Sequence, residues 1–296
     1  MNLKKKFSIL TYNVGIITKD LDAVMEKGLN VGDIRWLKHN YRDRFFADPF
    51  LFDEDAESYY ILVEEFLFWE ERGKITLLKV KKSDFSLEDR KIVIDESFHM
   101  SFPFCEPGGN TITPEMAASG EARIYTIDKD TMEIMSQKKI FGEGTIDAVF
   151  YTNEKNEKLC LTGKVHLPSF ELYMLKQRRD GTYEQVGDMI EYDHGSVRGA
   201  GRFFTWEGNL YRPVQDCNVR YGQQTKILEI KKLDSTGYEY ETVTELNSFK
   251  NPPYDETFHT FNVYKNCIIV DGSKDFVRFP MKFVYRKMRF LFKKEK

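Results

Sequence analysis

Five short segments of similar character recur along the chain, and this internal repeat restricts the fold more than any other feature. They read FFADPFLF, SFPF, TIDAVFY, RGAGRFF and HTFNVY, and their reference residues lie roughly 40 to 60 residues apart: Asp48, Pro103, Asp147, Arg198 and His259. After each segment come a turn, a second strand and a more polar third strand. One four-stranded unit per roughly 40–50 residues is typical of a propeller blade. The repeat therefore predicts an all-β fold, a five-bladed β-propeller with four-stranded antiparallel blades.

The spacing of the repeat also predicts the domain organisation. We expect residues 1–296 to form a single propeller domain, with blades over 45–96, 97–140, 141–193, 194–255 and 256–282. Residues 7–17 read as a strand that completes the last blade and closes the ring, because an open sheet stack would leave edges unpaired. Residues 19–28 predict one short N-terminal helix, with Asp20 or Asp22 near its start and Gly28 as its stop.

The C-terminal tail, residues 283–296, differs from the rest because lysines and arginines alternate with Phe and Leu. It has two interpretations. One is a last strand followed by a solvated basic end, which the shortness of the segment favours. The other is a peripheral contact with an anionic membrane.

Composition excludes several classes of protein. Hydrophobic residues make up 41% and the net charge is −3, so the chain can bury a core and has no global field that attracts nucleic acid. It has no P-loop, no GxSxG elbow and no run of roughly 18 apolar residues. Its four cysteines form no CxxC pair, which favours free thiols in a reducing compartment. The basic start is broken by Thr11 and Asn13 and lacks a cleavage site, so we expect a cytoplasmic protein.

The candidate catalytic residues are carboxylates at the starts of the inner strands, which converge on the central channel of a propeller. Asp48 stands at the head of an apolar run, where a carboxylate is costly to bury without a partner. Asp147 recurs at the equivalent point of the third segment, and Glu115 is a candidate third acid. Two inward carboxylates are what cleavage of a glycosidic bond requires. The alternative for Asp48 is a turn aspartate that caps backbone amides.

The candidate substrate-binding residues carry charges or amides in the same region of each repeat. Residues 194–217 are rich in arginine and glycine, and an arginine fork suits a carboxylate or a phosphate. Structural ion pairs with nearby aspartates are the alternative. Strand alternation requires one of Glu64 and Glu65 to point inward, and we choose Glu65. The full set is Arg198, Arg202, Arg212, Asp216, His259, Asn262 and Glu65. No loop has the spacing of calcium ligands and no zinc spacing occurs, so we predict no metal and no cofactor.

These motifs together resemble a known family. The segments from about residue 40 to 272 are similar to the N-terminal domain of glucosamine inositolphosphorylceramide transferases, whose stand-alone bacterial relatives occur with surface-polysaccharide genes. That domain is similar in turn to the five-bladed propellers of family 43 and family 32 glycoside hydrolases. The resemblance implies that Asp48 matches the base or nucleophile and Asp147 the aspartate that modulates pKa. Arg198 stands near the place of the general acid, which is a departure from the family 43 pattern.

Two main hypotheses follow for the function. In the first, the chain is a glycosidase-like enzyme that acts on a surface polysaccharide or on the glycan of a glycolipid, with Glu115 or Asp216 replacing the missing acid. In the second, it is a non-catalytic glycan-binding module that serves a polysaccharide-assembly glycosyltransferase. A third, weaker hypothesis is a structural partner that docks on such a transferase through the basic tail. The expected ligand in the first two is an oligosaccharide.

Overall fold

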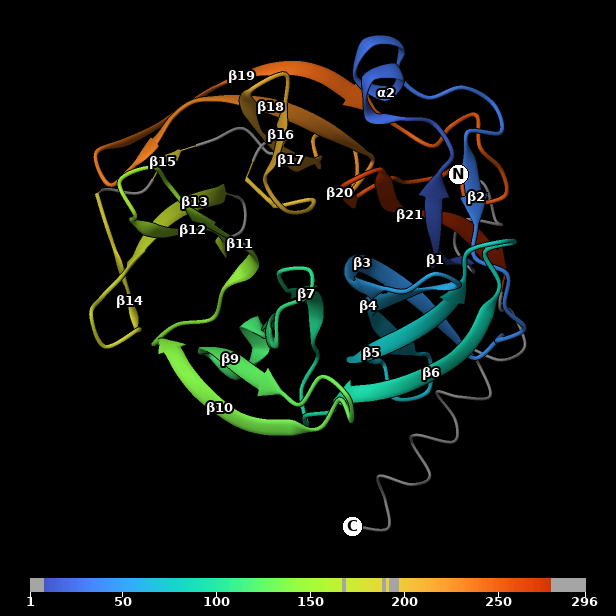
Figure 1. The fold of residues 1–296 in the computed structure, drawn as a ribbon, viewed down its shortest axis with the longest axis horizontal. Coiled ribbons are helices and arrows are strands. Elements are labelled where there is room, and N and C mark those ends of the chain that lie inside the picture. The colour runs from blue at the N-terminus through green and yellow to red at the C-terminus, as the bar shows by residue number, and fades with distance from the viewer. Residues whose placement is uncertain (1–7, 167–168, 188–189, 192–196, 278–296) are drawn as a thin grey trace.

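The computed structural model describes residues 8–166, 169–187, 190–191 and 197–277, and these form a ring of five β-sheets around a central axis (Figure 1). Each sheet has four antiparallel strands in a meander, and a short extra strand, β15, pairs with β13 in the third. The predicted five-bladed β-propeller is therefore confirmed. The C-terminal tail, residues 283–296, lies outside the described residues.

The strands of each blade run outward from the axis in chain order, apart from those of the fifth blade. Blade one contains β3 (Arg44–Glu54), β4 (Ser58–Leu67), β5 (Arg72–Lys81) and β6 (Leu87–Ile94). Blade two contains β7 (Ser101–Phe104), β8 (Thr111–Glu115), β9 (Ala122–Ile127) and β10 (Ile134–Phe141). Blade three contains β11 (Ile146–Thr152), β12 (Lys158–His166), β13 (Ser169–Gln177), β14 (Tyr183–Gln185) and β15 (Ile190–Glu191). Blade four contains β16 (Phe204–Trp206), β17 (Asn209–Asp216), β18 (Gln224–Asp234) and β19 (Gly237–Leu246).

The fifth blade joins the two ends of the described chain. Its inner strands are β20 (Phe261–Tyr264) and β21 (Cys267–Val277), and its outer strands are β1 (Ser8–Ile17) and β2 (Ile34–Trp36). β1 pairs with β21 over ten residues, from Ser8 opposite Val277 to Ile17 opposite Ile268. A long ladder between the two ends closes the ring, so that neither the first nor the last blade presents an unpaired edge at the joint.

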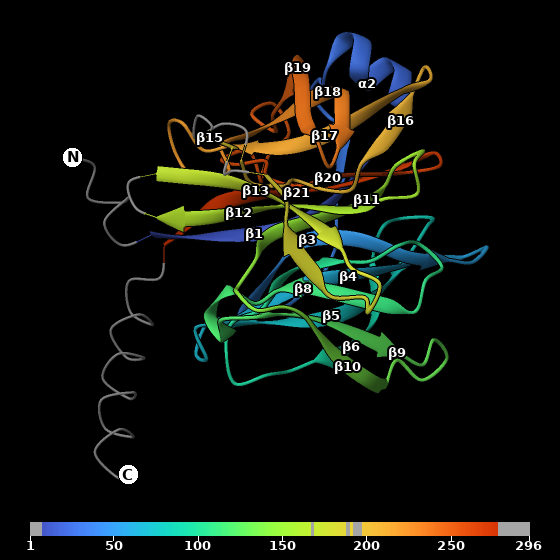
Figure 2. The same cartoon turned by 90° about the vertical axis from the view of Figure 1, so that its left-hand side faces the viewer.

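The predicted helix lies on the outside of the ring, against blades four and five (Figure 2). Helix α2 spans Leu21–Lys27, and the Asp20 side chain caps its start by accepting a hydrogen bond from the Ala23 amide at 2.8 Å. Gly28 ends it. Val24 and Met25 are buried beneath it, which is why a short helix is stable here. Apart from this helix, the described residues contain one 3-10 turn, η1 (Ala117–Ser119).

Most of the hydrophobic core lies between neighbouring blades. Large clusters join blades one and two, four and five, and five and one, and a smaller one joins three and four. A small cluster of Ala148, Cys160 and Leu175 lies in blade three, and Phe141 of blade two packs against it. All four cysteines are free, and three of them are buried. Among the described residues no helix is long and apolar enough to span a membrane.

The starts of three inner strands share an unusual backbone conformation that positions the central site. Asp48, Phe102 and Asp147 have φ values of 49°, 42° and 45°. Each lies where the pairing with the next strand shifts register: between Ala47 and Phe50, Ser101 and Phe104, and Ile146 and Val149 respectively. Bulges of this kind re-aim the backbone, and left-handed φ values are costly for residues other than glycine. The amides of these three residues therefore point away from their own sheets and receive partners from other blades.

Candidate functional site

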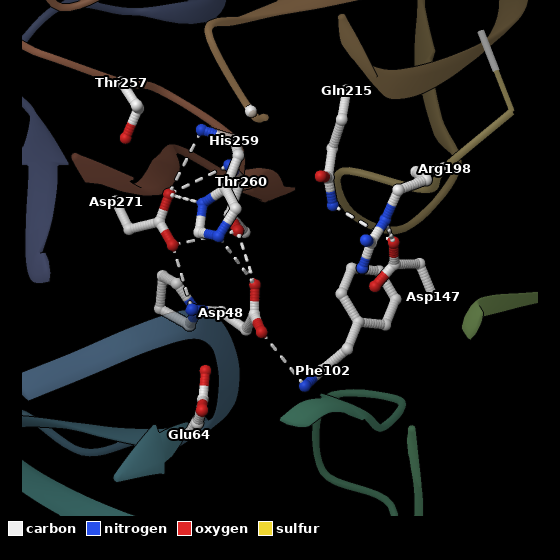
Figure 3. A network of polar contacts seen from close by, with 12 residues as sticks. Asp48, Glu64, Phe102, Asp147, Arg198, Gln215, Thr257, His259, Thr260 and Asp271 are labelled. Carbon is white, nitrogen blue, oxygen red and sulfur yellow. Dashed lines mark hydrogen bonds and ion pairs between the residues drawn. The ribbon is translucent and has the colours of Figure 1, made fainter. Parts of the chain in front are cut away.

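Two polar clusters occupy the centre of the ring (Figure 3). The first, which we call the histidine cluster, consists of Asp48, His259, Thr260 and Asp271. The second, the arginine cluster, consists of Glu115, Asp147, Arg198 and Gln215. The predicted residues Asp48, Asp147, Glu115, Arg198 and His259 thus meet near one axis, although they come from five different blades.

Asp271 of β21 is the centre of the histidine cluster. Its Oδ1 accepts hydrogen bonds from the amides of His259 and Thr260 at 3.3 and 3.0 Å and lies 2.7 Å from His259 Nδ1. Its Oδ2 accepts from the Asp48 amide at 2.9 Å and from the Thr260 hydroxyl at 3.2 Å. Asp271 is fully buried. Five donors around one carboxylate replace the water that it loses on folding.

Asp48 and His259 form the other half of this cluster. Asp48 Oδ1 lies 3.6 Å from His259 Nε2 and accepts from the Thr260 hydroxyl at 3.2 Å. Burial raises the pKa of Asp48 to about 6, although the charge of His259 opposes the shift. For His259, burial alone would lower the pKa, but Asp271 and Asp48 raise it to about 9. The imidazole is therefore a cation at neutral pH, held between two carboxylates.

Asp48, His259 and Asp271 also offer three ligand atoms within 4.8 Å of one another, a spacing that could hold a metal ion. The hydrogen bonds already occupy these atoms, however. Nδ1 of His259 faces Asp271, and both oxygens of Asp271 accept from two or more donors. A protonated His259 supplies the positive charge that a metal would bring. The donor set therefore fits an ion-pair network better than a metal centre.

Glu64, and not Glu65, faces the central clusters, so the predicted choice between them was wrong. The nearby carboxylates Asp48 and Glu115 add to burial in raising the pKa of Glu64 well above its usual value. Glu65 lies on the other side of the sheet, fully buried, where Arg44 and Arg90 pair with it and Thr76 donates a hydrogen bond at 2.7 Å. The alternation along β4 was correctly expected, and Glu64 is the residue of the two that lies on the side of Asp48.

In the arginine cluster, one guanidinium serves two carboxylates. Arg198 Nε donates to Asp147 Oδ2 at 2.5 Å, and Nη2 lies 3.6 Å from Glu115 Oε2. Gln215 donates to the same Asp147 oxygen at 3.2 Å and to the Gly199 carbonyl at 2.9 Å. Burial and the charge of Asp147 raise the pKa of Glu115 well above its usual value, although Arg198 opposes this.

Carboxylates link successive blades through the left-handed residues described above. Asp271 of blade five binds the Asp48 amide of blade one, Asp48 Oδ2 binds the Phe102 amide of blade two at 3.2 Å, and Glu115 binds the Asp147 amide of blade three at 3.1 Å. Asp147 continues the series to Arg198 of blade four. The central carboxylates therefore hold the ring together, in addition to any role toward a ligand.

Tyr221 covers the space between the two clusters. Its ring lies 4.8 Å from the Arg198 guanidinium carbon and contacts His259 edge-on at 5.7 Å, and it is 46% exposed. Gly222 allows the loop to approach this closely, because a Cβ there would lie 2.6 Å from the Cβ of His259, and its φ is +58°. Tyr12 stacks on His259 with ring centroids 4.8 Å apart.

Four other predicted residues lie outside these clusters. Arg202 crosses the axis deeper in the ring and donates to the carbonyls of Cys105 and Leu51 at 2.5 and 2.7 Å. Asn262 accepts from the Arg202 amide and donates to the Pro49 carbonyl, both at 2.8 Å. Both residues thus connect blades.

Arg212 is fully buried and donates to the Val197 carbonyl and the Tyr238 hydroxyl, within the core between blades three and four. Asp216 accepts hydrogen bonds from the Asn218 amide and from Gln224, and it pairs with Lys226 at 3.3 Å. The structure does not bring either residue to the two central clusters, and both already have protein partners.

The set of candidate residues left out Asp271, Thr260, Gln215 and Tyr221, and it included Glu65 in place of Glu64. Asp271 carried the same signal as Asp48, a carboxylate among apolar residues (CIIVDG). It lies outside the five repeated segments, from which most of the candidates came. No feature of the sequence distinguishes Tyr221 from the other tyrosines.

With this geometry in view, comparisons with known proteins identify the family. The sequence profile of the family "Glucosamine inositolphosphorylceramide transferase 1, N-terminal" matches residues 34–256. The chain belongs to this family. It is 26% identical over 216 residues to the glucosamine inositolphosphorylceramide transferase 1 of Oryza sativa subsp. indica, covering 67% of this chain and 28% of the relative. The chain thus spans about a quarter of the length of the curated relatives that it matches.

Solved structures show the same fold at low sequence identity. An α-L-arabinofuranosidase from Lactobacillus brevis is 13% identical, with a TM-score of 0.53 over 79% of this chain and 85% of that one. A family 43 β-xylosidase/α-arabinofuranosidase from a compost metagenome is 10% identical, with a TM-score of 0.51 over 79% of this chain and 91% of that one. This chain therefore shares the five-bladed architecture of these glycoside hydrolases.

Proposed function

We propose that this chain is a glycan-binding propeller that recognises a surface polysaccharide or a glycolipid glycan without cleaving it. The observation that carries the proposal is the position of Arg198, which pairs with both Asp147 and Glu115. Hydrolysis of a glycosidic bond requires two carboxyl groups that are free to exchange protons or to attack the sugar. Here the Arg198 guanidinium pairs with two of the central carboxyl groups, and Asp48 contacts His259, Thr260 and the Phe102 amide.

The exposed fractions of the side chains support recognition at the surface beside Tyr221, Arg198 and Glu115, which we call the channel mouth, and not at the buried carboxylates below it. Asp48 and Asp147 are only 5% and 2% exposed, whereas Tyr221 lies open at the surface. The Arg198 and Glu115 side chains are partly accessible beside it. An aromatic ring with polar groups at its edge suits the apolar face and the hydroxyls of a sugar.

A buried acceptor beside the arginine cluster also supports a ligand. Oε1 of Gln215, which is 1% exposed, has no hydrogen-bond partner among the described residues. Buried polar atoms in native proteins nearly always have a partner, so an unpaired carbonyl oxygen at this position favours a hydroxyl donor from outside the chain. Because the oxygen itself is covered, a water molecule that bridges it to a sugar bound next to Arg198 would satisfy it.

Hydrolysis is the second candidate function, and one observation favours it. Burial and the charge of Asp147 raise the pKa of Glu115 well above its usual value, which is the direction of shift that a general acid needs. In this alternative Asp48 is the base or nucleophile, Asp147 tunes it and Glu115 protonates the leaving group. The same site would then act on the same class of glycan.

The proposal includes a cellular setting. The free thiols support a reducing compartment such as the cytoplasm. The short coverage of the curated relatives supports a role beside a separate polysaccharide-assembly glycosyltransferase, as a module that holds the glycan. If the basic tail contributes to docking, deletion of residues 283–296 should release the protein from membranes that contain the transferase, and unchanged association would remove the tail from the proposal.

Screening acidic and phosphorylated oligosaccharides for thermal stabilisation, followed by calorimetry on the best ligand, tests the proposal. Tyr221→Ala should weaken binding at least tenfold. Val219→Ala, in the same loop and 83% exposed, is the matched control and should leave binding unchanged. Prolonged incubation should yield no cleaved product. Product that disappears in Asp48→Asn would establish hydrolysis instead, and failure of every oligosaccharide to bind would reject both functions.

A further inference from the structure

A cleft of about 380 Å³, which we call the interblade cleft, lies between blades two and three. The small apolar cluster beside it, Ala148, Cys160 and Leu175, comes from blade three alone, and the large cluster of blades one and two reaches blade three through Val149 and Phe150. The cleft is open to solvent on one side, so a small molecule can enter it.

The interblade cleft is separate from the central clusters. Its inner end is formed by Phe104 and Cys105 and by residues 150–152, which lie three or more residues beyond Asp147 along β11 and two or more beyond Phe102 along β7. Strands rise about 3.3 Å per residue, so the inner end of the cleft lies about 10 Å further along the inner strand from Asp147. At its outer end, Lys138 of β10 donates a hydrogen bond to the Asp180 carbonyl of blade three.

The lining of the interblade cleft combines aromatic rings with dispersed polar groups. Phe150 is flanked by Phe104 and Tyr183, with ring centroids 5.1 and 5.5 Å away. The polar residues Thr111, Thr113 and Gln177 also line the cleft. The charged residues of the lining are two lysines, Lys138 and Lys158, and one carboxylate, Glu106, so their sum is positive.

We propose that the interblade cleft binds a single sugar unit that carries an anionic group, such as a uronate or a sugar phosphate. The volume is at the lower end of the range for small-molecule sites, which suits one or two sugar rings. Aromatic walls match the apolar faces of a sugar ring, while the hydroxyl and amide groups match its hydroxyls. The excess of lysine selects the anionic substituent. The choice of a sugar over another ring-shaped anion rests on the proposed function, but the site does not involve the central clusters.

The test uses three probes, glucuronic acid, glucose 6-phosphate and neutral glucose, each titrated into the full chain and followed by saturation-transfer NMR. The two acidic sugars should bind at least about fivefold more tightly than glucose, as one well-placed charge pair allows. Lys158→Gln should reduce this preference to near unity. Lys250→Gln, an exposed lysine in a loop of blade four, is the matched control and should change nothing.

A second variant fills the interblade cleft. Thr111→Phe should abolish binding of all three probes without lowering the melting temperature, because it adds apolar volume where the packing is incomplete. If the probes bind equally well to Thr111→Phe but not to Tyr221→Ala, the sugar site is the channel mouth alone, and the cleft proposal fails while the proposed function stands. If no probe binds at millimolar concentration, or Thr111→Phe only raises the melting temperature, the cleft is a packing gap.

Discussion

The histidine cluster and the arginine cluster balance the charge of buried carboxylates with different cations. Both place buried carboxylates on the axis, and in both a carboxylate binds the amide of a left-handed residue in the next blade. In the histidine cluster the compensating charge is an imidazolium, buried to 2% exposure and able to lose its proton. In the arginine cluster it is a guanidinium at the rim, which stays charged at all accessible pH values.

This difference separates two roles within one channel. The histidine cluster is closed and its carboxylate oxygens are occupied, which is typical of a structural network that fixes a ring. The arginine cluster is partly open, lies under Tyr221 and contains the unpaired Gln215 oxygen. We infer that the first cluster holds the blades and that the second meets the ligand. The predictions below are chosen to break this assignment.

The largest effect is expected from Asp271→Ala. Removal of this carboxylate leaves the Asp48, His259 and Thr260 amides without an acceptor and leaves a buried imidazolium beside Asp48 alone. Breaking a buried ion pair by removing one partner typically costs about 3–5 kcal/mol, and we expect the free energy of unfolding in urea to fall by about that amount. Asp275→Asn, exposed on the same strand, is the control. A loss below about 1 kcal/mol would contradict the structural role of the histidine cluster.

The second prediction concerns pH. The pKa of His259 is raised to about 9 in the folded protein, above its usual value of 6.5. Its contribution to stability is therefore fully present below pH 6.5 and is lost as the pH rises through 9. A shift of this size corresponds to a loss on the order of 3 kcal/mol over that interval. Unfolding free energies measured from pH 6.5 to 9.5 should show the loss in the wild type, and His259→Gln should flatten the profile. An equally steep profile in the variant would assign the titration to another group.

The sequence predicted the fold better than it predicted the residues of the central site. The repeat predicted the propeller because every blade starts with an apolar segment, and four of its reference residues do meet at the axis. Asp271 was not predicted because it lies outside the five repeated segments, and the antiparallel pairing of β20 with β21 brings it beside His259 and Thr260. The choice between Glu64 and Glu65 failed because strand alternation requires one of the two to point inward but does not say which one.

Charge alone was also an insufficient guide to location. Arg198, Arg202 and Arg212 lie within fifteen residues of one another and looked alike in the sequence. Arg198 lies at the rim, Arg202 crosses the axis to two backbone carbonyls, and Arg212 is buried between two blades. The location of each arginine depends on hydrogen-bond and ion-pair partners that are distant in the sequence.

The third prediction is Arg198→Gln, which should cost less than Asp271→Ala. Asp147 loses its cation but keeps the hydrogen bond from Gln215, and the rim position allows water to replace the guanidinium in part. We expect a loss of about 2 kcal/mol in the free energy of unfolding, together with at least a tenfold loss of glycan affinity. Arg198→Lys should recover part of the stability but little of the affinity, because an ammonium group cannot serve two carboxylates as a planar fork can. Unchanged affinity in both variants would remove the arginine cluster from the binding site.

The smallest effect is expected from Glu64→Gln, and it tests the corrected assignment on β4. Burial and the nearby Asp48 raise the pKa of Glu64 well above its usual value, so a charge on this side chain is disfavoured, and an amide of the same shape should change the free energy of unfolding by less than about 0.5 kcal/mol. The adjacent Glu65→Gln is the matched comparison. It removes the charge that pairs with Arg44 and Arg90, so it should cost about 2–3 kcal/mol in the same denaturation experiment. Equal costs for the two variants would mean that Glu64 is ionised beside Asp48, which would add a further negative charge to the two carboxylates that His259 already faces.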